Sequence, residues 1–386
     1  MSSLAKRIFR RTWKQGRKRY VLLGLPLITC LWVTYLLTSR PHREAHDLPR
    51  DTNTGQMLFE VPVHATPQGL AKELHAKGLI AHPLTFRLFL RATGRDRQIK
   101  AGFFAVKPRN SVLEMSWLIT DGKLATRTIT IAEGKASWEI YGILKQRFGL
   151  DSLTFDSLAN SAAFARELGL DAPGLEGYLF PDTYVLPWKI SEKEVLRLMV
   201  KRFQAVVEQI HPHSPVTDRY GIHGWLTLAS IVEKEAAVPS ERKLIAGVFY
   251  NRLLENWSLG ADPTVRYSVK KLTGRLTYSD LNVNSPYNTR RFAGLPPGPI
   301  CNPGKGALLA ALNPLQTDMM FFVAKDDGSR THFFSRDNTE HVNYKGLAAE
   351  NRRKSREAKM IQQVLMQASP AISDSSVADS SPARKH

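Results

Sequence analysis

Two glutamates, Glu233 and Glu235, stand two residues apart inside an otherwise largely apolar stretch, LASIVEKEAAVPSERKLIAGVFYNRL, which runs from Leu228 to Leu253. A carboxyl group pressed against apolar side chains keeps its proton to a higher pH. Such an acid can protonate a glycosidic oxygen, which is the first step in cleaving a sugar–sugar bond. Alternatively, both carboxylates are solvated and pair with Lys or Arg, a contact worth about half a kcal/mol. The pattern alone leaves both interpretations open.

The spacing of the apolar residues predicts a helix over residues 225–254, with a break allowed before Pro239. At about 100° per residue, Glu235 falls between Leu228 and Ile231, at the flank of the apolar arc. We therefore expect burial to raise the pKa of Glu235.

The same geometry separates the two glutamates. Residues two apart on a helix point about 200° away from each other, so Glu233 and Glu235 cannot both face one scissile bond. A glycosidase that uses two carboxyl groups would have to take the second one from elsewhere. Asp262, in LGADPTVRYS, is the nearest candidate along the chain.

An uncharged segment of 18 residues, YVLLGLPLITCLWVTYLL, follows residues 1–19, which hold eight basic side chains and no acid. As a helix it would be roughly 27 Å long, enough to cross the hydrocarbon core of a bilayer. The positive charges before it place the N-terminus in the cytoplasm and the rest of the chain outside the membrane. The residues after it offer no convincing signal-peptide cleavage site, so we expect an uncleaved anchor.

The formal net charge is +19, and much of it lies near the two ends of the chain. Basic residues beside a membrane segment need no nucleic acid to explain them, and the middle carries no nucleic-acid motif. We therefore predict no nucleic-acid partner. The two cysteines, Cys30 and Cys301, are far apart, and no pair of Cys or His has metal-ligand spacing. We predict no disulfide, no metal and no cofactor.

Residue patterning after the anchor predicts a small strand–helix–helix–strand unit. Its expected elements are a strand at Phe59–Val63, a helix opened by Thr66-Pro67, a helix at Pro83–Ala92, a strand at Gly102–Val106 and a further helix at Ser111–Ile119. A fainter echo follows, with a strand at Thr126–Ala132 and a helix from about Ser137.

The predicted fold class is α+β. The predicted organisation is a basic cytoplasmic segment (1–19), a single transmembrane helix (20–37), a linker (38–57), a small βααβ subdomain (58–125), a larger mixed α+β domain (126–350) and a disordered tail (351–386).

Five motifs in a fixed order resemble those of the endolytic murein transglycosylases, the YceG-like family. They are EGYLFPDTY (Glu176–Tyr184), the EKE stretch, DPTVRYS (Asp262–Ser268), SPYNTRRFAGLPPGPICNPG (Ser285–Gly304) and THFF (Thr331–Phe334). One EKE would be a weak signal, but five ordered motifs behind a single anchor are strong. The resemblance covers roughly residues 55–345.

The resemblance implies a bacterial inner-membrane protein with a LysM-like subdomain, here residues 58–125, and a catalytic domain that faces the periplasm, here residues 126–350. Members of the family cut nascent peptidoglycan strands internally, at the MurNAc-β-1,4-GlcNAc bond. They do so without water and leave 1,6-anhydro-MurNAc ends, which would make the protein a terminase of glycan elongation. The implied partners are peptidoglycan glycan strands, the inner membrane and peptidoglycan synthases.

The family's catalytic glutamate is the second acid of EKE, which is Glu235 here. It would protonate the leaving oxygen and then, as a carboxylate, take the proton of the MurNAc C6 hydroxyl as that oxygen closes on C1. One residue serves both steps, so no second carboxylate is required. The residues expected to bind substrate or support the site are Glu233, Asn251, Asp262, Tyr287, Asn288, Thr289 and His332. Of these, Tyr287–Thr289 lie in a Pro- and Gly-rich loop, where polar side chains can reach a sugar.

Two other functions remain open at this stage. One is a peptidoglycan hydrolase that uses Glu235 together with a second acid such as Asp262. The other is a non-enzymatic glycan-binding protein that scaffolds wall synthesis through its LysM-like part. The second glutamate of EKE argues against the non-enzymatic function, and the chemistry of the cleaved glycan ends separates the two enzymes.

Overall fold

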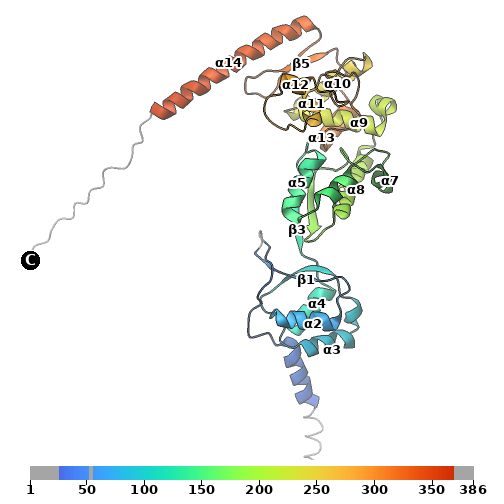
Figure 1. Ribbon diagram of the computed structural model, residues 1–386, viewed down its shortest axis with the longest axis vertical. Coiled ribbons are helices and arrows are strands. Elements are labelled where there is room, and N and C mark those ends of the chain that lie inside the picture. The colour runs from blue at the N-terminus through green and yellow to red at the C-terminus, as the bar shows by residue number, and fades with distance from the viewer. Residues whose placement is uncertain (1–25, 52–54, 369–386) are drawn as a thin grey trace, which may run out of the picture. The chain divides into compact units, whose positions relative to one another are not determined.

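The computed structural model describes residues 26–51 and 55–368 (Figure 1). The chain divides into two compact units, the first made of residues up to Thr130 together with Thr183–Ser191, the second of Ile131–Asp182 and the residues from Glu192 onward. Over the described residues the fold is mixed α+β, mostly helical, with small two-stranded sheets. The predicted α+β class is confirmed at this level.

The first unit contains the predicted strand–helix–helix–strand order. Its elements are β1 (Met57–Val61), α2 (Pro67–Ala76), α3 (Pro83–Ala92), the short 3-10 helix η1 (Arg95–Arg97), β2 (Gly102–Val106), α4 (Val112–Thr120), β3 (Thr126–Thr130) and β4 (Thr183–Pro187). β1 pairs antiparallel with β2, and β3 pairs antiparallel with β4. β1 begins two residues earlier than predicted, whereas α3 and β2 have the predicted bounds.

Local capping chemistry explains where the helices of this unit begin. The Thr66 side chain accepts a hydrogen bond from the Gly69 amide, and Pro67 takes the first helical position of α2. Ser111 and Glu114 form a reciprocal capping box at the start of α4. Phe59 of β1 lies opposite Phe104 of β2, and both rings are buried in the core of the unit.

The predicted membrane segment is only partly described. Residues 26–38 are helical, and Leu37 packs against the core of the first unit. Residues 20–25 of the predicted span lie outside the described part of the chain. Among the described helices, none combines the length and the apolar character needed to cross a bilayer.

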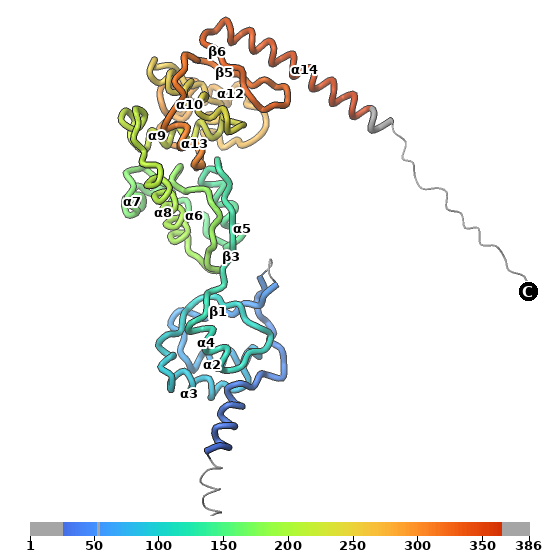
Figure 2. The backbone as a smooth tube through the Cα atoms, turned by 180° about the vertical axis from the view of Figure 1, so that it is seen from behind, coloured from blue at the N-terminus to red at the C-terminus, as the bar shows by residue number. Residues whose placement is uncertain are grey.

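The second unit holds the remaining elements (Figures 1 and 2). They are α5 (Ser137–Phe148), α6 (Ser152–Ala159), α7 (Ala162–Glu167), α8 (Glu192–Ile210), α9 (Pro215–Glu235), η2 (Pro239–Glu241), α10 (Arg242–Leu254), α11 (Asp262–Ser268), α12 (Tyr278–Leu281), α13 (Lys305–Leu312), β5 (Phe321–Ala324), β6 (His332–Ser335) and α14 (Asn338–Ala368).

Helix α9 is the centre of the second unit. It packs against α13, α10 and α11, and every residue from Trp225 to Val232 is buried, including the polar Thr227 and Ser230. The Trp225 ring nitrogen donates to the Leu308 carbonyl of α13 at 3.0 Å. The amphipathic arc expected from the sequence is therefore wrong for this stretch, because neighbours cover the helix on more than one side. Gly221, with φ of 67°, breaks the helix two turns after its start.

Helix α14 corrects the predicted start of a disordered tail at residue 351. The helix continues through Ala368, while residues 369–386 lie outside the described part of the chain. Its sequence here is rich in Ala, Glu, Lys, Arg and Gln, which favour helix. Two ion pairs at i,i+4 spacing, Arg353–Glu357 and Lys354–Glu350, add local support.

Candidate active site

Glu235 is the last residue of α9. The helix ends there because Ala236 adopts an extended backbone conformation, and Pro239 opens η2 three residues later. The predicted break thus falls before Pro239, and α10 follows as a separate helix. The C-terminal end of a helix carries partial negative charge, which disfavours an ionised carboxylate at that position.

A pocket of about 480 Å³ includes Glu235 in its wall. Its other ionisable side chains are Arg252, Asp262, Arg290, His332, His341 and Lys345, and its apolar ones include Phe249 and Phe322. These residues come from the end of α9, from α10, the start of α11, the loop between α12 and α13, β5, β6 and α14, all of which belong to the second unit (Figure 2).

The pKa of Glu235 is raised from 4.5 to about 7, chiefly by burial and secondarily by the negative charge of Asp262. Arg252 opposes the shift. The rise expected from the sequence is therefore found. Within the described residues, no hydrogen bond reaches the Glu235 carboxyl, so its proton is available to a molecule that enters the pocket.

Glu233 is held differently. Its side chain is only 8% exposed and pairs with the Arg242 guanidinium at 3.4 Å. It also accepts a hydrogen bond from the Gly304 amide, at the start of α13. Burial raises the pKa of Glu233, while Arg242 lowers it. Glu233 therefore ties the end of α9 to α10 and α13, and it does not line the pocket that contains Glu235.

We expect Glu233→Gln to lower the free energy of unfolding by about 1–2 kcal/mol, because the change removes one of the two carboxylate partners of the partly buried Arg242. Activity at the pocket should fall much less than in a Glu235 variant. Urea denaturation and an activity assay on the same preparation measure both quantities. Complete inactivity at undiminished stability would contradict this assignment.

A third carboxyl group, Glu176 of the EGYLFPDTY motif, also has its pKa raised by burial to about 7. Its oxygens are fully occupied by donors. They accept hydrogen bonds from the Ser137 amide and hydroxyl, the Asn302 side chain and the Tyr267 hydroxyl. This carboxyl caps the start of α5 and joins it to two distant segments, so a raised pKa alone does not mark an acid catalyst.

Arg252, on α10, lines the pocket beside Glu235. Its guanidinium donates to the Met320 carbonyl at 2.8 Å and to the Leu259 carbonyl at 2.6 Å. These contacts fix both flanks of the pocket, and the cation lies close enough to lower the pKa of Glu235. The neighbouring Asn251 donates to the carbonyls of Thr317 and Met319, so it braces the segment before β5.

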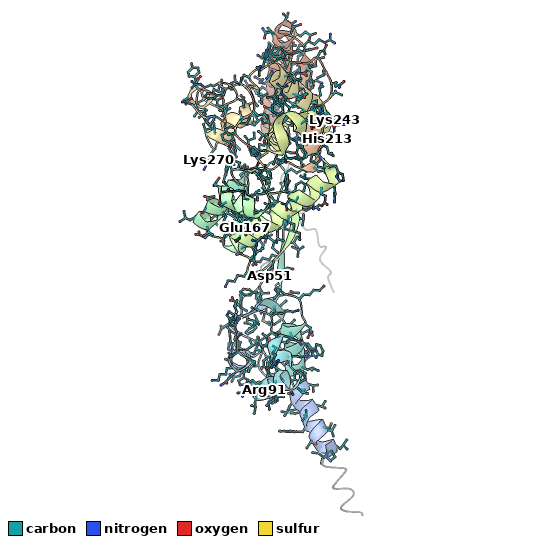
Figure 3. All side chains as sticks on the ribbon, turned by 90° about the vertical axis from the view of Figure 1, so that its right-hand side faces the viewer. Asp51, Arg91, Glu167, His213, Lys243 and Lys270 are labelled. Carbon is teal, nitrogen blue, oxygen red and sulfur yellow. The ribbon has the colours of Figure 1, made fainter. Side chains whose placement is uncertain are left out.

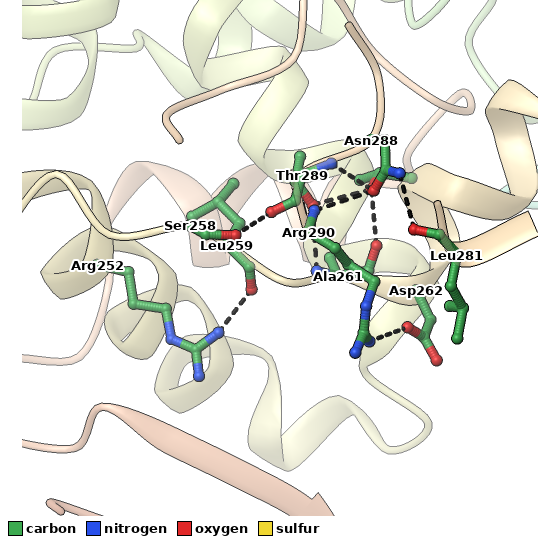
Figure 4. Close-up of polar contacts among 10 residues, drawn as sticks. Arg252, Ser258, Leu259, Ala261, Asp262, Leu281, Asn288, Thr289 and Arg290 are labelled. Atoms are coloured by element: carbon green, nitrogen blue, oxygen red, sulfur yellow. Dashed lines mark hydrogen bonds and ion pairs between the residues drawn. The ribbon is translucent and has the colours of Figure 1, made fainter. Parts of the chain in front are cut away.

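The polar side chains of Asn288 and Thr289 face the protein interior and form hydrogen bonds with neighbouring segments (Figure 4). Asn288 is fully buried, and its amide group donates to the Leu281 and Val283 carbonyls while its oxygen accepts from the Arg290 amide. Thr289 is also buried and accepts a hydrogen bond from the Ala261 amide. Asn288 therefore holds the segment that follows α12, Thr289 supports the loop that leads into α11, and neither side chain lines the pocket.

The remaining predicted residues separate into two places. Asp262 lies in the pocket wall, where Arg290 pairs with it at 2.7 Å (Figure 4). Tyr287 packs on Tyr267 with ring centroids 4.9 Å apart and lines a second, smaller pocket of about 160 Å³ near Glu176. The structure thus brings Glu235, Asp262 and His332 together, and leaves Glu233, Asn251, Tyr287, Asn288 and Thr289 outside that pocket.

His332 lines the pocket together with a partner that the sequence analysis missed. Glu241, at the end of η2, accepts hydrogen bonds from the His332 amide at 2.9 Å and from its Nδ1 at 2.7 Å. A carboxylate only accepts, so Nδ1 carries a proton and Nε2 is the ring nitrogen left for other contacts. In the sequence, Glu241 is simply the acid of VPSERK, and it lies 91 residues before His332, so the pairing could not be inferred from spacing.

Among the described residues, no group of three or more His, Cys, Asp or Glu is arranged to hold a metal ion.

The chain belongs to a known family. The model of the YceG-like family matches residues 59–346, and the chain is a member of that family. An endolytic murein transglycosylase of Bacillus subtilis (strain 168) is 30% identical over 288 residues, which cover 70% of this chain and 79% of the relative. A protein of the same name from Streptococcus pneumoniae (serotype 2, strain D39) is 27% identical over 339 residues, 77% of this chain and 61% of the relative.

A solved structure agrees with these relatives. The crystal structure of a YceG-like protein from Listeria monocytogenes matches with a TM-score of 0.52 and 28% identity, covering 75% of this chain and 98% of that one. The family predicted from the five motifs is therefore confirmed. The predicted enzyme class, lytic transglycosylase, is confirmed at the level of the relatives' names.

Proposed function

We propose that this chain is a peptidoglycan lytic transglycosylase that cuts within nascent glycan strands, at the MurNAc-β-1,4-GlcNAc bond, and leaves 1,6-anhydro-MurNAc ends. The observation that carries the proposal is the Glu235 carboxyl group. Its pKa is near 7, it lies in the wall of an open pocket, and no hydrogen bond within the described residues engages it. Family membership supports the same substrate and reaction.

The proposed reaction uses Glu235 twice. Its carboxylic acid first donates a proton to the glycosidic oxygen, so that the bond from MurNAc C1 to that oxygen breaks. The resulting carboxylate then accepts the proton of the MurNAc C6 hydroxyl, whose oxygen bonds to C1. The proton balance closes, because Glu235 ends as it began, and no water is consumed. A pKa near 7 suits both halves of this exchange.

The other predicted residues have supporting roles in this proposal. Glu233, Asn251, Asn288 and Thr289 hold the segments that shape the pocket, through the contacts given above. His332 offers Nε2 to the substrate from a ring oriented by Glu241. Tyr287 lines a neighbouring pocket, and Asp262 tunes the pKa of Glu235.

The proposed setting is the bacterial inner membrane. Residues 20–37 would form a single span with the N-terminus in the cytoplasm, and the catalytic residues would face the periplasm. The strand–helix–helix–strand order supports a LysM-like subdomain in the first unit. An anchor of this kind would keep the enzyme beside peptidoglycan synthases and let it end glycan elongation.

A hydrolase is the second candidate, because Asp262 shares the pocket with Glu235. The two functions differ in the glycan ends that they leave. We expect full-length protein in detergent to release fragments with 1,6-anhydro-MurNAc ends from purified peptidoglycan, as measured by mass spectrometry. The matched reference is the same peptidoglycan cut by a hydrolase, whose fragments are heavier by one water. Reducing ends in the products of this protein would overturn the lytic assignment.

A further inference from the structure

Helix α3 of the first unit has an outer face that does not pack against the core. Its inner side chains, Phe86 and Leu90, are completely buried in the core of the unit. Leu84 and Leu88 point elsewhere and are 60% and 57% exposed. Two apolar side chains one turn apart on a solvated helix face need a reason, since polar residues there would be more soluble.

The same face carries arginines without partners. Arg87 and Arg91 lie at i,i+4 spacing on α3, and Arg97 ends η1. Within the described residues, none of the three has an ion pair or hydrogen bond, whereas the nearby Arg95 pairs with Asp121. Asp96 is the only acid among the described residues that line the groove beside them, which has a volume of about 760 Å³. The groove is therefore strongly cationic.

The chemistry of the groove favours phosphate over sugar. Guanidinium groups bind phosphate oxygens through paired hydrogen bonds. A neutral glycan would call for aromatic faces on which sugar rings stack, and the groove's described lining, which includes Thr66, Gln68 and Leu88, contains no aromatic side chain. Exposed leucines beside arginines are the composition of a helix that lies at a bilayer surface.

The location of α3 within the unit also favours contact with a bilayer surface. His82, which precedes α3, contacts Tyr35 of the helix at residues 26–38, with ring centroids 6.4 Å apart. That helix exposes Leu31 and Trp32, which are apolar. Figures 1 and 2 show α3 at the end of the unit beside this helix, and Figure 3 shows Arg91 there.

We propose that the outer face of α3 and the adjoining groove form a docking surface for anionic phospholipid headgroups. Arg87, Arg91 and Arg97 bind the phosphates, and Leu84 and Leu88 enter the headgroup layer. The surface would fix how the first unit stands on the membrane. The inference rests on the proposed membrane anchor, and no step of the glycan cleavage depends on it.

The test uses full-length protein in lipid nanodiscs and measures hydrogen–deuterium exchange of residues 84–97. Discs of phosphatidylcholine alone are compared with discs that also contain phosphatidylglycerol. We expect exchange in this segment to slow several-fold in the anionic discs, and the protection to fade at high salt. Exchange in β1 and β2 should be the same in both discs, which provides the internal reference for folding.

Variants decide whether the arginines are responsible. Arg87→Glu combined with Arg91→Glu should abolish the difference between the two discs. Arg50→Glu combined with Lys123→Glu makes the same charge change at exposed residues outside the groove and should preserve it. Equal protection in both discs, or protection that survives in the groove variant, would overturn the proposal. So would slowing of exchange in phosphatidylcholine discs by inorganic phosphate or soluble chitooligosaccharide, because the ligand would then be a free anion or a glycan.

Failure here is separable from failure of the proposed function. Protein that does not associate with either disc would overturn the docking surface and the anchor together. Cleavage of purified peptidoglycan by the same preparations in detergent reports on the enzyme alone. There the groove variant should retain wild-type activity, and inactivity of the wild-type protein would count against the transglycosylase and not against the docking surface.

Discussion

Glu235→Gln is expected to lower the rate of glycan cleavage by about 10²–10⁴-fold, the range that general acid–base catalysis contributes. Glutamine has nearly the same size and shape but can neither donate the proton to the leaving oxygen nor accept one from the C6 hydroxyl. The rate is measured as release of anhydro-ended fragments from peptidoglycan. Glu208→Gln, an exposed position on α8, makes the same chemical change and should leave the rate unaltered.

The stability of the Glu235→Gln variant should be kept or increased, although its activity is lost. The pKa of Glu235 lies above its unfolded value of 4.5, so the folded state holds this proton more tightly than the unfolded state. This group's contribution to stability is therefore present below pH 4.5 and is lost as pH rises toward 7. Glutamine removes that dependence. Thermal unfolding of the variant at pH 8 should occur at the wild-type temperature or above it.

An active Glu235→Gln variant with unchanged product ends would refute the catalytic assignment. Loss of activity with a large drop in unfolding temperature would also count against it, because it would indicate a structural role. The combination of lost activity and kept or increased stability is specific to a buried catalytic acid, since active sites carry groups whose environment is unfavourable to the fold.

Elements set by neighbouring residues could be predicted from the sequence. The bounds of α3 and β2, and the start of α2 at Pro67, follow from patterning and from caps within three residues. In each of these cases the deciding interactions are close along the chain. The direction of the Glu235 pKa shift was also predicted, but its causes extend beyond α9: the pocket beside Glu235 is lined by α10 and β5, and Asp262 of α11 adds its negative charge.

Contacts between segments that lie far apart along the chain could not be predicted from the sequence. The complete burial of Trp225–Val232 depends on α13, which begins about 70 residues later, so the single apolar face expected for this helix was wrong. Asn288 shows a second limit. A polar side chain in a Pro- and Gly-rich loop either faces a ligand or satisfies the loop's own carbonyls, and composition does not distinguish the two. Here it satisfies the carbonyls of Leu281 and Val283.

Two charges near Glu235 shift its pKa in opposite directions, so removing each one should shift the pH dependence of activity in opposite directions. Arg252 lowers the pKa of Glu235, and Asp262 raises it. Arg252→Met should therefore shift the alkaline limb of the activity profile to higher pH, because Glu235 keeps its proton longer. Asp262→Asn should shift the limb to lower pH. The measurement is the pH dependence of kcat/KM, which reports on the free enzyme.

Arg252→Met should also be the more damaging change to the fold. It removes charged hydrogen bonds to the carbonyls of Met320 and Leu259, which together stabilise the protein by about 3 kcal/mol or more. Arg252→Lys is the matched control, since it keeps the positive charge but not the paired geometry. The lysine variant should lose stability while keeping the alkaline limb near its wild-type position, which separates the electrostatic effect from the structural one.

Asp262→Asn also separates the lytic enzyme from a two-carboxylate hydrolase. If Glu235 acts alone, this variant keeps substantial activity at pH values below its shifted limb, because Asp262 then raises the pKa of Glu235 but takes no part in proton transfer. If Asp262 were the second acid, activity would fall by orders of magnitude at every pH. Shifts of the same sign in the Arg252→Met and Asp262→Asn variants would contradict the opposite effects that the two charges are expected to have on the pKa of Glu235.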